Sequence, residues 1–200
     1  FIGNKIFENY DFDNLRQRID WTPFFRTWEL SGKFPKILDD NVVGETAQSL
    51  FEDAKKMLDE IIKNKWMEAR AIIGFYPANS QDDDILVYTD EKRTDVRLTL
   101  SFLRQQMKRE SGKANLCLSD FVAPSGSSYD DYIGFFIVTS GFKIENKIKE
   151  FKDNNDDYNE ILLKALADRL AEAFAEKMHS EVRQAWGYEF PGQLSNQDYI

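Results

Sequence analysis

The stretch that decides the fold class runs from Asp157 to Trp186 and reads DYNEILLKALADRLAEAFAEKMHSEVRQAW. Its apolar residues recur at three- and four-residue spacing, which is the period of an amphipathic helix. Asp157 and Glu160 are expected to cap the start of this helix, and Gly187 is expected to end it. The sequence therefore predicts one long helix, whose core stripe consists of Leu163, Leu166, Leu170, Phe174 and Met178.

Upstream of this helix, four segments predict strands. The runs over residues 69–75 and 132–139 are apolar and are interpreted as buried strands, ended by Pro77 and by a Ser-Gly pair. Residues 85–89 and 94–102 are rich in β-branched and aromatic side chains and flank a short polar stretch. This pattern predicts an antiparallel hairpin.

Helices are expected on either side of these strands, over residues 45–66 and 143–152. Residues 20–44 carry Pro23 and Pro35 among many aromatic side chains, and they are expected to be ordered but irregular. Because the strands come in hairpins and the helices cluster towards the two ends, the predicted fold class is α+β with a mainly antiparallel sheet.

The charge balance and the scarcity of metal-binding side chains exclude several classes of function. Among 200 residues, 26 are Lys or Arg and 35 are Asp or Glu, so the net charge is −9, which disfavours nucleic-acid binding. The longest apolar run, over residues 132–138, is too short to cross a membrane. One cysteine and one histidine exclude an internal disulfide and a typical structural zinc site. We therefore expect a cytoplasmic protein without a bound metal.

The chain carries no nucleotide-binding motif and no evident catalytic constellation. Neither G-x-G-x-x-G nor a Walker sequence is present, which argues against a Rossmann-type site and a P-loop. Glu176 and His179 have the spacing of a di-iron half-site, but no second pair exists, so an exposed helix face is the favoured interpretation. Cys117 lies in an apolar segment and is interpreted as a buried, inert thiol.

Two groups of carboxylates have competing interpretations. Asp20 precedes the aromatic-rich stretch Trp21–Phe25, where a carboxylate either binds a cationic ligand beside apolar rings or pins an irregular segment. The residue types leave these two roles equally open. Asp168, Glu172 and Glu176 stand four apart, opposite the leucine stripe. A solvated helix face is favoured there over an acidic docking edge.

Several short blocks of sequence are more informative about the protein family than the amino-acid composition is. They are DWTPFF at Asp20–Phe25, GFYPAN at Gly74–Asn79, LRQQ at Leu103–Gln106, LSDFVAP at Leu118–Pro124, DYIG at Asp131–Gly134, DDYN at Asp156–Asn159, KALADRLAEAFAE at Lys164–Glu176 and WGY at Trp186–Tyr188. In this order, they resemble the activation domain of cobalamin (vitamin B12)-dependent methionine synthase. The resemblance runs from about residue 15 to 198, and residues 1–200 are interpreted as one such domain.

The resemblance implies a C-shaped domain with a twisted antiparallel sheet. Enzymes of this kind are methyltransferases that move a methyl group from methyltetrahydrofolate to homocysteine through cobalamin, in methionine biosynthesis. The activation domain binds S-adenosylmethionine and docks over cobalamin, which a neighbouring module of the same polypeptide holds. With an electron from flavodoxin or a similar reductase, it supports reductive methylation of cob(II)alamin to methylcobalamin. No catalytic residue is assigned, and the isolated domain is not expected to catalyse the reaction alone.

Residue by residue, the resemblance assigns Asp20 to S-adenosylmethionine binding, and Asp168 and Glu172 to the docking surface. The family's other ligand stretch, Arg-Pro-Ala-Pro-Gly-Tyr, would fall beyond Ile200, and Ser195–Asp198 matches a helix start, so we expect a domain truncated on its C-terminal side. One alternative is a domain that docks a cobalamin module or a reductase without binding a ligand. Another is a free-standing methyltransferase, which the missing Gly-rich loop disfavours.

Overall fold

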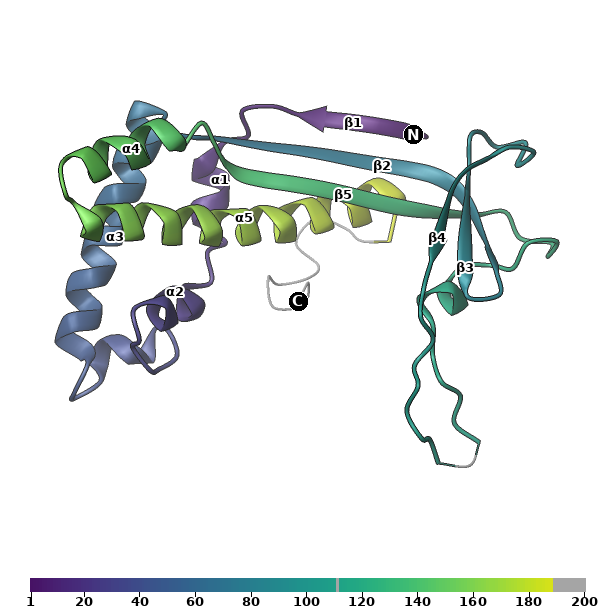
Figure 1. The fold of residues 1–200 in the computed structure, drawn as a ribbon, viewed down its shortest axis with the longest axis horizontal. Coiled ribbons are helices and arrows are strands. Elements are labelled where there is room, and N and C mark those ends of the chain that lie inside the picture. The colour runs from purple at the N-terminus through teal and green to yellow at the C-terminus, as the bar shows by residue number, and fades with distance from the viewer. Residues whose placement is uncertain (111, 189–200) are drawn as a thin grey trace. The chain divides into compact units, whose positions relative to one another are not determined.

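A computed structural model describes residues 1–110 and 112–188 of the chain. The helix start predicted at Ser195–Asp198 lies outside these residues. Along the chain (Figure 1) the elements are β1 (Gly3–Phe7), α1 (Phe12–Arg16), α2 (Trp21–Thr27), η1 (Lys36–Asp39), α3 (Gly44–Asn64), β2 (Glu68–Gln81), β3 (Asp84–Tyr88), β4 (Val96–Ser101), η2 (Leu118–Phe121), β5 (Asp131–Phe142), α4 (Glu145–Asp153) and α5 (Asp157–Trp186).

The strands form an open sheet in the order β1-β2-β3-β4, in which β5 also pairs with β2. β2 and β3 are antiparallel, with Ala78 opposite Val87. β3 and β4 are antiparallel as well, with Ile85 opposite Leu100, which is the hairpin that the sequence predicts. The α+β class, the mainly antiparallel sheet and the long C-terminal helix are therefore confirmed.

By its contacts, the chain divides into two compact units. The first comprises Phe1–Lys5 and Ile73–Phe135, and we call it the hairpin unit because it contains β3 and β4. The second comprises Ile6–Ile72 and the chain from Phe136 onwards, and we call it the helical unit because it contains α1 to α5. β2 and β5 contribute residues to both units.

The hairpin unit joins several of the sequence blocks through the side chain of Arg93. Its Nη1 donates to Oδ1 of Asn79 at 2.8 Å, and its Nη2 donates to the carbonyl of Asp131 at 2.9 Å. The Asp131 carboxylate in turn accepts the N–H of Ala123 at 2.8 Å. These blocks thus secure the strand ends around a small apolar core of Ala78, Ile85 and Val87.

A second arginine fixes the segment after β4. Arg104 places Nη2 2.7 Å from Oδ1 of Asp83 and Nη1 2.7 Å from Oδ2 of Asp120. The hydrogen bond from Arg104, together with the N–H of Cys117, lowers the pKa of Asp120 to about 2. Leu103–Gln106 and Leu118–Pro124 therefore meet through an ion-pair network, which gives both blocks a structural role.

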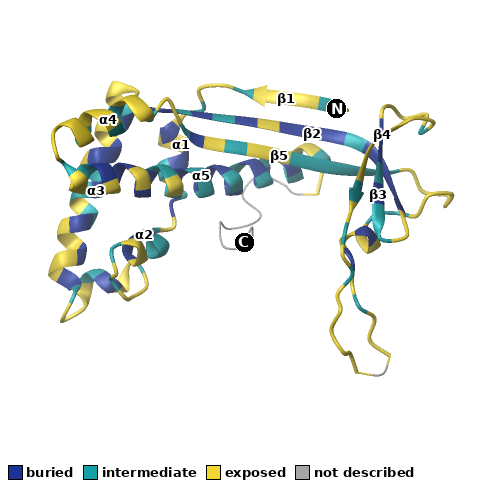
Figure 2. Cartoon of the chain, viewed as in Figure 1, coloured by how far each residue is buried: buried dark blue, intermediate teal, exposed yellow. Residues whose placement is uncertain are grey.

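The helical unit is organised around α5, which contacts α1, α2, α3 and α4. In Figure 2, buried and exposed residues alternate along α3 and α5, as expected of helices that bury one face. α3 buries Ala47, Leu58 and Ile61. The predicted stripe of α5 is confirmed, because all its members are 0% exposed: Leu163, Leu166, Leu170, Phe174 and Met178.

Two features of the helices correct the sequence predictions. Asp156, and not Asp157, is the N-cap of α5, since its Oδ1 accepts the N–H of Asn159 at 3.1 Å. The segment expected to be irregular contains α2, and Pro23 is tolerated because it lies in the first turn, where a backbone N–H has no helical partner. The predicted end of α5 is confirmed, with Gly187 in a left-handed conformation at φ 86°.

Both long strands continue beyond their predicted ends. β2 passes Pro77 because residues 78–81 pair with β3. β5 continues through its Ser-Gly pair to Phe142. The prediction that this strand is buried is wrong, since Ile137 is 71% exposed. An apolar run shows that one face of a strand is suited to a core, and does not show that both faces are covered.

Candidate functional site

Asp20 stands directly before α2 and caps its N-terminus. Its Oδ1 accepts a hydrogen bond from the N–H of Thr22 at 2.9 Å, and its backbone is extended, with φ −76° and ψ 111°. The pinning role that the sequence left open is therefore present. The side chain also lies on the wall of a pocket and is exposed, so the cap leaves the carboxylate accessible to a ligand.

The pocket beside Asp20 has a volume of about 480 Å³, which is within the range of small-molecule sites. The N–H of Phe34 donates to Oγ1 of Thr22 at 3.3 Å, so the loop after α2 is tied back to the helix. The rings of Trp21 and Phe34 have centroids 6.5 Å apart. The charged and aromatic residues that line the pocket are Arg18, Asp20, Trp21, Arg26, Lys33, Phe34 and Glu176.

Glu176 reaches this pocket from α5 and is a buried carboxyl group. It is 6% exposed, and its Oε2 has no hydrogen-bond partner among the described residues. Burial, followed by the nearby charge of Glu172, raises its pKa to about 7, with Asp20 adding to the rise and Arg18 opposing it. Two carboxyl groups of different environment thus line one pocket.

The pocket combines groups of both charges with aromatic rings. Asp20 and Glu176 suit an ammonium or sulfonium group, while Arg18 and Lys33 suit a carboxylate. Trp21 and Phe34 offer faces for a ring or an apolar chain. The arrangement fits a zwitterionic ligand with a cationic centre. Within residues 1–110 and 112–188, no three His, Cys, Asp or Glu side chains gather as they would around a metal ion.

The acidic edge on α5 is only partly as predicted. The side chains of Asp168 and Glu172 are 72% and 41% exposed, which confirms that they are accessible. Arg169 pairs with both, with Nη2 2.7 Å from Oδ2 of Asp168. Glu176 leaves this edge and is buried, so the expectation of an exposed face over Glu176 and His179 is wrong for the glutamate.

The side chains of His179 and Cys117 pack against other residues of the fold. The ring of His179 is half-buried and stacks on Phe136 with a centroid separation of 6.1 Å. Cys117 is 3% exposed, and its Sγ lies 3.6 Å from the carbonyl of Asp83, which confirms the interpretation of a buried thiol.

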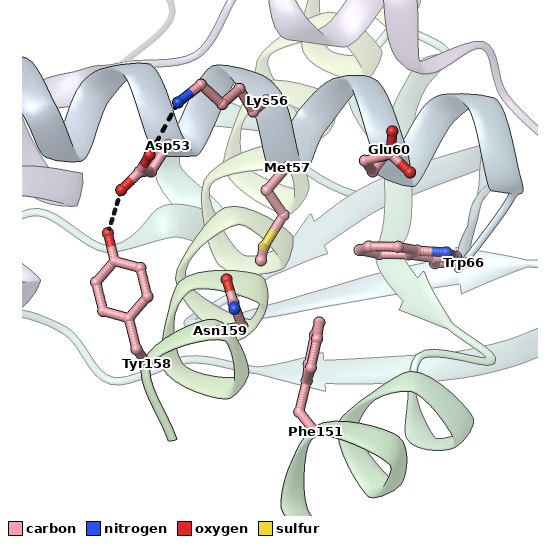
Figure 3. Close-up of a pocket in the computed structure, with 8 residues that line it drawn as sticks. All are labelled: Asp53, Lys56, Met57, Glu60, Trp66, Phe151, Tyr158 and Asn159. Carbon is pink, nitrogen blue, oxygen red and sulfur yellow. Dashed lines mark hydrogen bonds and ion pairs between the residues drawn. The ribbon is translucent and has the colours of Figure 1, made fainter. Parts of the chain in front are cut away.

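A second pocket, of about 390 Å³, lies between α3, α4 and α5 in the helical unit (Figure 3). The hydroxyl of Tyr158 donates to Oδ2 of Asp53 at 2.9 Å, and burial followed by this bond raises the pKa of Tyr158 to about 12. Oε2 of Glu60 accepts a bond from Asn64 at 2.6 Å. Since both carboxylates already have partners within the chain, this pocket is a weaker candidate than the one beside Asp20.

Residues 11–200 match the family model described as the vitamin B12 dependent methionine synthase, activation domain. The chain belongs to this activation-domain family. Among the described residues, no helix of the activation domain combines the length and apolar character required to cross a membrane.

A solved structure agrees with the family match. The crystal structure titled as the MetH reactivation domain bound to AdoHcy is 50% identical in sequence and superimposes with a TM-score of 0.94. The match covers 100% of the present chain and 61% of the chain in the crystal structure.

The candidate site contains residues that sequence reasoning missed. Arg18 and Lys33 were not singled out, and Glu176 was placed on the wrong surface. The signal for Glu176 was present in the helix geometry. Each step of four residues turns about 40° beyond a full turn, so Glu176 lies about 80° around α5 from Asp168. This rotation carries it from the exposed edge towards α2.

Proposed function

We propose that this activation domain binds S-adenosylmethionine in the pocket lined by Asp20, and that it serves the reductive methylation of cobalamin in a methionine synthase. The observation that carries the proposal is the pairing of Asp20 with a mixed-charge, aromatic pocket in a chain of this family. The similar reactivation domain, whose title reports bound AdoHcy, supports a ligand of the same chemical type.

The described residues fit this ligand. S-adenosylmethionine carries a sulfonium, an ammonium, a carboxylate and an adenine ring. Asp20 and Glu176 would hold positive charge, Arg18 or Lys33 would hold the carboxylate, and Trp21 would cover an apolar part. When bound, the ligand supplies a methyl group that, with one electron from a reductase, converts cob(II)alamin to methylcobalamin. The domain's own residues bind and orient the donor.

The remaining partners follow from the same proposal. A cobalamin-binding module of the same polypeptide would dock onto this domain, and flavodoxin or a similar reductase would deliver the electron. We place a docking surface at the exposed edge of Asp168 and Glu172, where the negative charge would attract a basic surface. The buried thiol of Cys117 is compatible with the reducing cytoplasm, where we place the protein.

Calorimetric titration of the full polypeptide with S-adenosylmethionine tests the proposal. We expect saturable binding, and we expect the ligand to be required for methylcobalamin formation from cob(II)alamin and a reductant. A polypeptide that folds and binds a cobalamin module without binding S-adenosylmethionine would favour the alternative of a docking domain. Binding with rapid methyl transfer to an acceptor other than cobalamin would favour an independent methyltransferase.

A further inference from the structure

We propose that Glu176 is a second ligand-binding carboxylate of the activation domain, which binds the positive charge of S-adenosylmethionine and releases a proton as it does so. This inference rests on the proposed function and deepens it, because it assigns the ligand's cation to a residue on α5 that lines the same pocket as Asp20.

The first support is geometric. Glu176 and Asp20 line the same pocket from different elements, α5 and the N-terminus of α2. Glu176 is 6% exposed, and its Oε2 has no hydrogen-bond partner within the described part of the chain. A buried oxygen without a partner costs free energy, and native proteins retain few of them. A cationic ligand in the pocket would supply the missing partner.

The second support is the set of charges that faces Glu176. Glu172 lies one turn earlier on α5, and Asp20 lies at the start of α2, and both disfavour its ionised form. Arg18, between α1 and α2, favours the ionised form, and the other cationic groups that line the pocket are Arg26 of α2 and Lys33 of the loop that follows. With burial as the largest cause, the pKa of Glu176 is raised to about 7. The free site therefore holds a mixture of both forms near neutral pH.

Ligand binding should shift this balance. A cation placed beside a carboxyl group favours the ionised form, so binding lowers the pKa of Glu176 and releases a proton. We therefore expect the affinity for S-adenosylmethionine to rise by roughly five- to tenfold between about pH 6 and about pH 7.5. The amino group of the ligand titrates in the same way with every variant, so the difference between variants isolates Glu176.

The experiment is calorimetric titration of the full methionine synthase polypeptide in buffers of different ionisation enthalpy, which counts the protons released. We expect the wild type to release protons near pH 7. Glu176→Gln should bind roughly tenfold more weakly at about pH 7.5 and should lack that release. Glu181→Gln is the matched control, because Glu181 is on the same helix, outside the pocket, and paired with Lys177 at 2.7 Å.

A parallel titration with S-adenosylhomocysteine locates the contact. If Glu176→Gln weakens only S-adenosylmethionine binding, the carboxylate faces the sulfonium. If it weakens the binding of both compounds, the carboxylate faces the ammonium, and either result supports the proposal. Wild-type affinity and proton release in a folded Glu176→Gln variant would overturn it.

The controls separate this inference from the proposed function. If Glu176→Gln does not fold, the proton release of the wild type still tests the proposal. Binding of S-adenosylmethionine by the wild type without proton release near pH 7 would contradict it. A wild-type polypeptide that does not bind S-adenosylmethionine refutes the proposed function itself. Binding that Asp20→Asn weakens and Glu176→Gln leaves unchanged refutes only the role of Glu176.

Discussion

Arg169 is bound to Asp168, with its Nη2 2.7 Å from Oδ2 of the carboxylate. The same guanidinium pairs with Glu172 through Nη1, and its side chain is only 13% exposed. The arginine therefore holds both acidic side chains on the edge of α5 while leaving them accessible. This arrangement gives the proposed docking surface a fixed geometry, and it offsets the repulsion between carboxylates placed four residues apart.

We expect Asp168→Asn and Glu172→Gln to change the melting temperature little, because exposed ion pairs contribute little to stability. Both variants should slow reactivation of cob(II)alamin by the holoenzyme, and the defect should depend on salt, because rim charges act mainly on association rates. The measurement is methylcobalamin formation at several salt and reductase concentrations. Normal reactivation throughout would return this edge to a solvated helix face.

The core stripe of α5 gives a prediction for stability. Leu166 is 0% exposed, so Leu166→Ala should lower the free energy of unfolding by about 2–5 kcal/mol through lost burial and a cavity. Urea unfolding followed by circular dichroism measures this change. The matched variant Ile161→Ala alters a residue of the same helix that is 47% exposed, and it should cost much less. Equal losses in the two variants would contradict the burial of Leu166 and the exposure of Ile161 on α5.

The ion pairs of Arg104 with Asp83 and Asp120 predict that the domain becomes less stable in acid. The pKa of Asp120 is lowered from 3.8 to about 2, mainly by Arg104, so the folded state favours the ionised form. Its contribution is fully present above about pH 4 and is lost as the pH falls towards 2. Asp120→Asn should lower the melting temperature at neutral pH, and the difference from wild type should shrink in acid. A pH-independent difference would contradict this assignment.

The raised pKa of Glu176 predicts the opposite dependence of stability on pH. Its pKa is raised from 4.5 to about 7, so the folded state favours the protonated form. This stabilisation is complete below about pH 4.5 and is lost as the pH rises through 7. Compared with Glu176→Gln, the ligand-free wild type should therefore lose melting temperature between these pH values. Parallel melting curves for the two proteins across that range would contradict the raised pKa.

The sequence predicted the elements of this domain better than their limits and surroundings. Periodicity located the buried stripe of α5 because helix packing repeats regularly along the chain. Pro77 predicts the end of a strand, but β2 continues to Gln81 because residues 78–81 pair with β3. Such pairing joins distant segments and leaves no local signal. The helix in residues 21–27 was missed because proline was weighed without its position in the first turn.

The candidate site was predicted only in part. Asp20 was identified, although its residue type left a cap and a ligand contact equally open, and the structure shows the cap. The pocket brings Asp20 together with Lys33 and with Glu176 on α5, an assembly that no local pattern in the sequence encodes. The burial of Glu176 depends on how α2 packs against α5, so its raised pKa required the tertiary structure.

The affinity of Asp20→Asn for S-adenosylmethionine, measured by calorimetry on the full polypeptide, tests the central claim most directly. Asparagine caps helices about as well as aspartate, so the variant keeps the bond to Thr22 and loses only the charge. Asp11→Asn, at the matching cap of α1, is the control, since Asp11 accepts the N–H of Asp13 at 3.0 Å and lies outside the pocket. We predict roughly ten- to a hundredfold weaker binding for Asp20→Asn and wild-type binding for the control. Unchanged affinity in a normally folded Asp20→Asn variant would contradict the account.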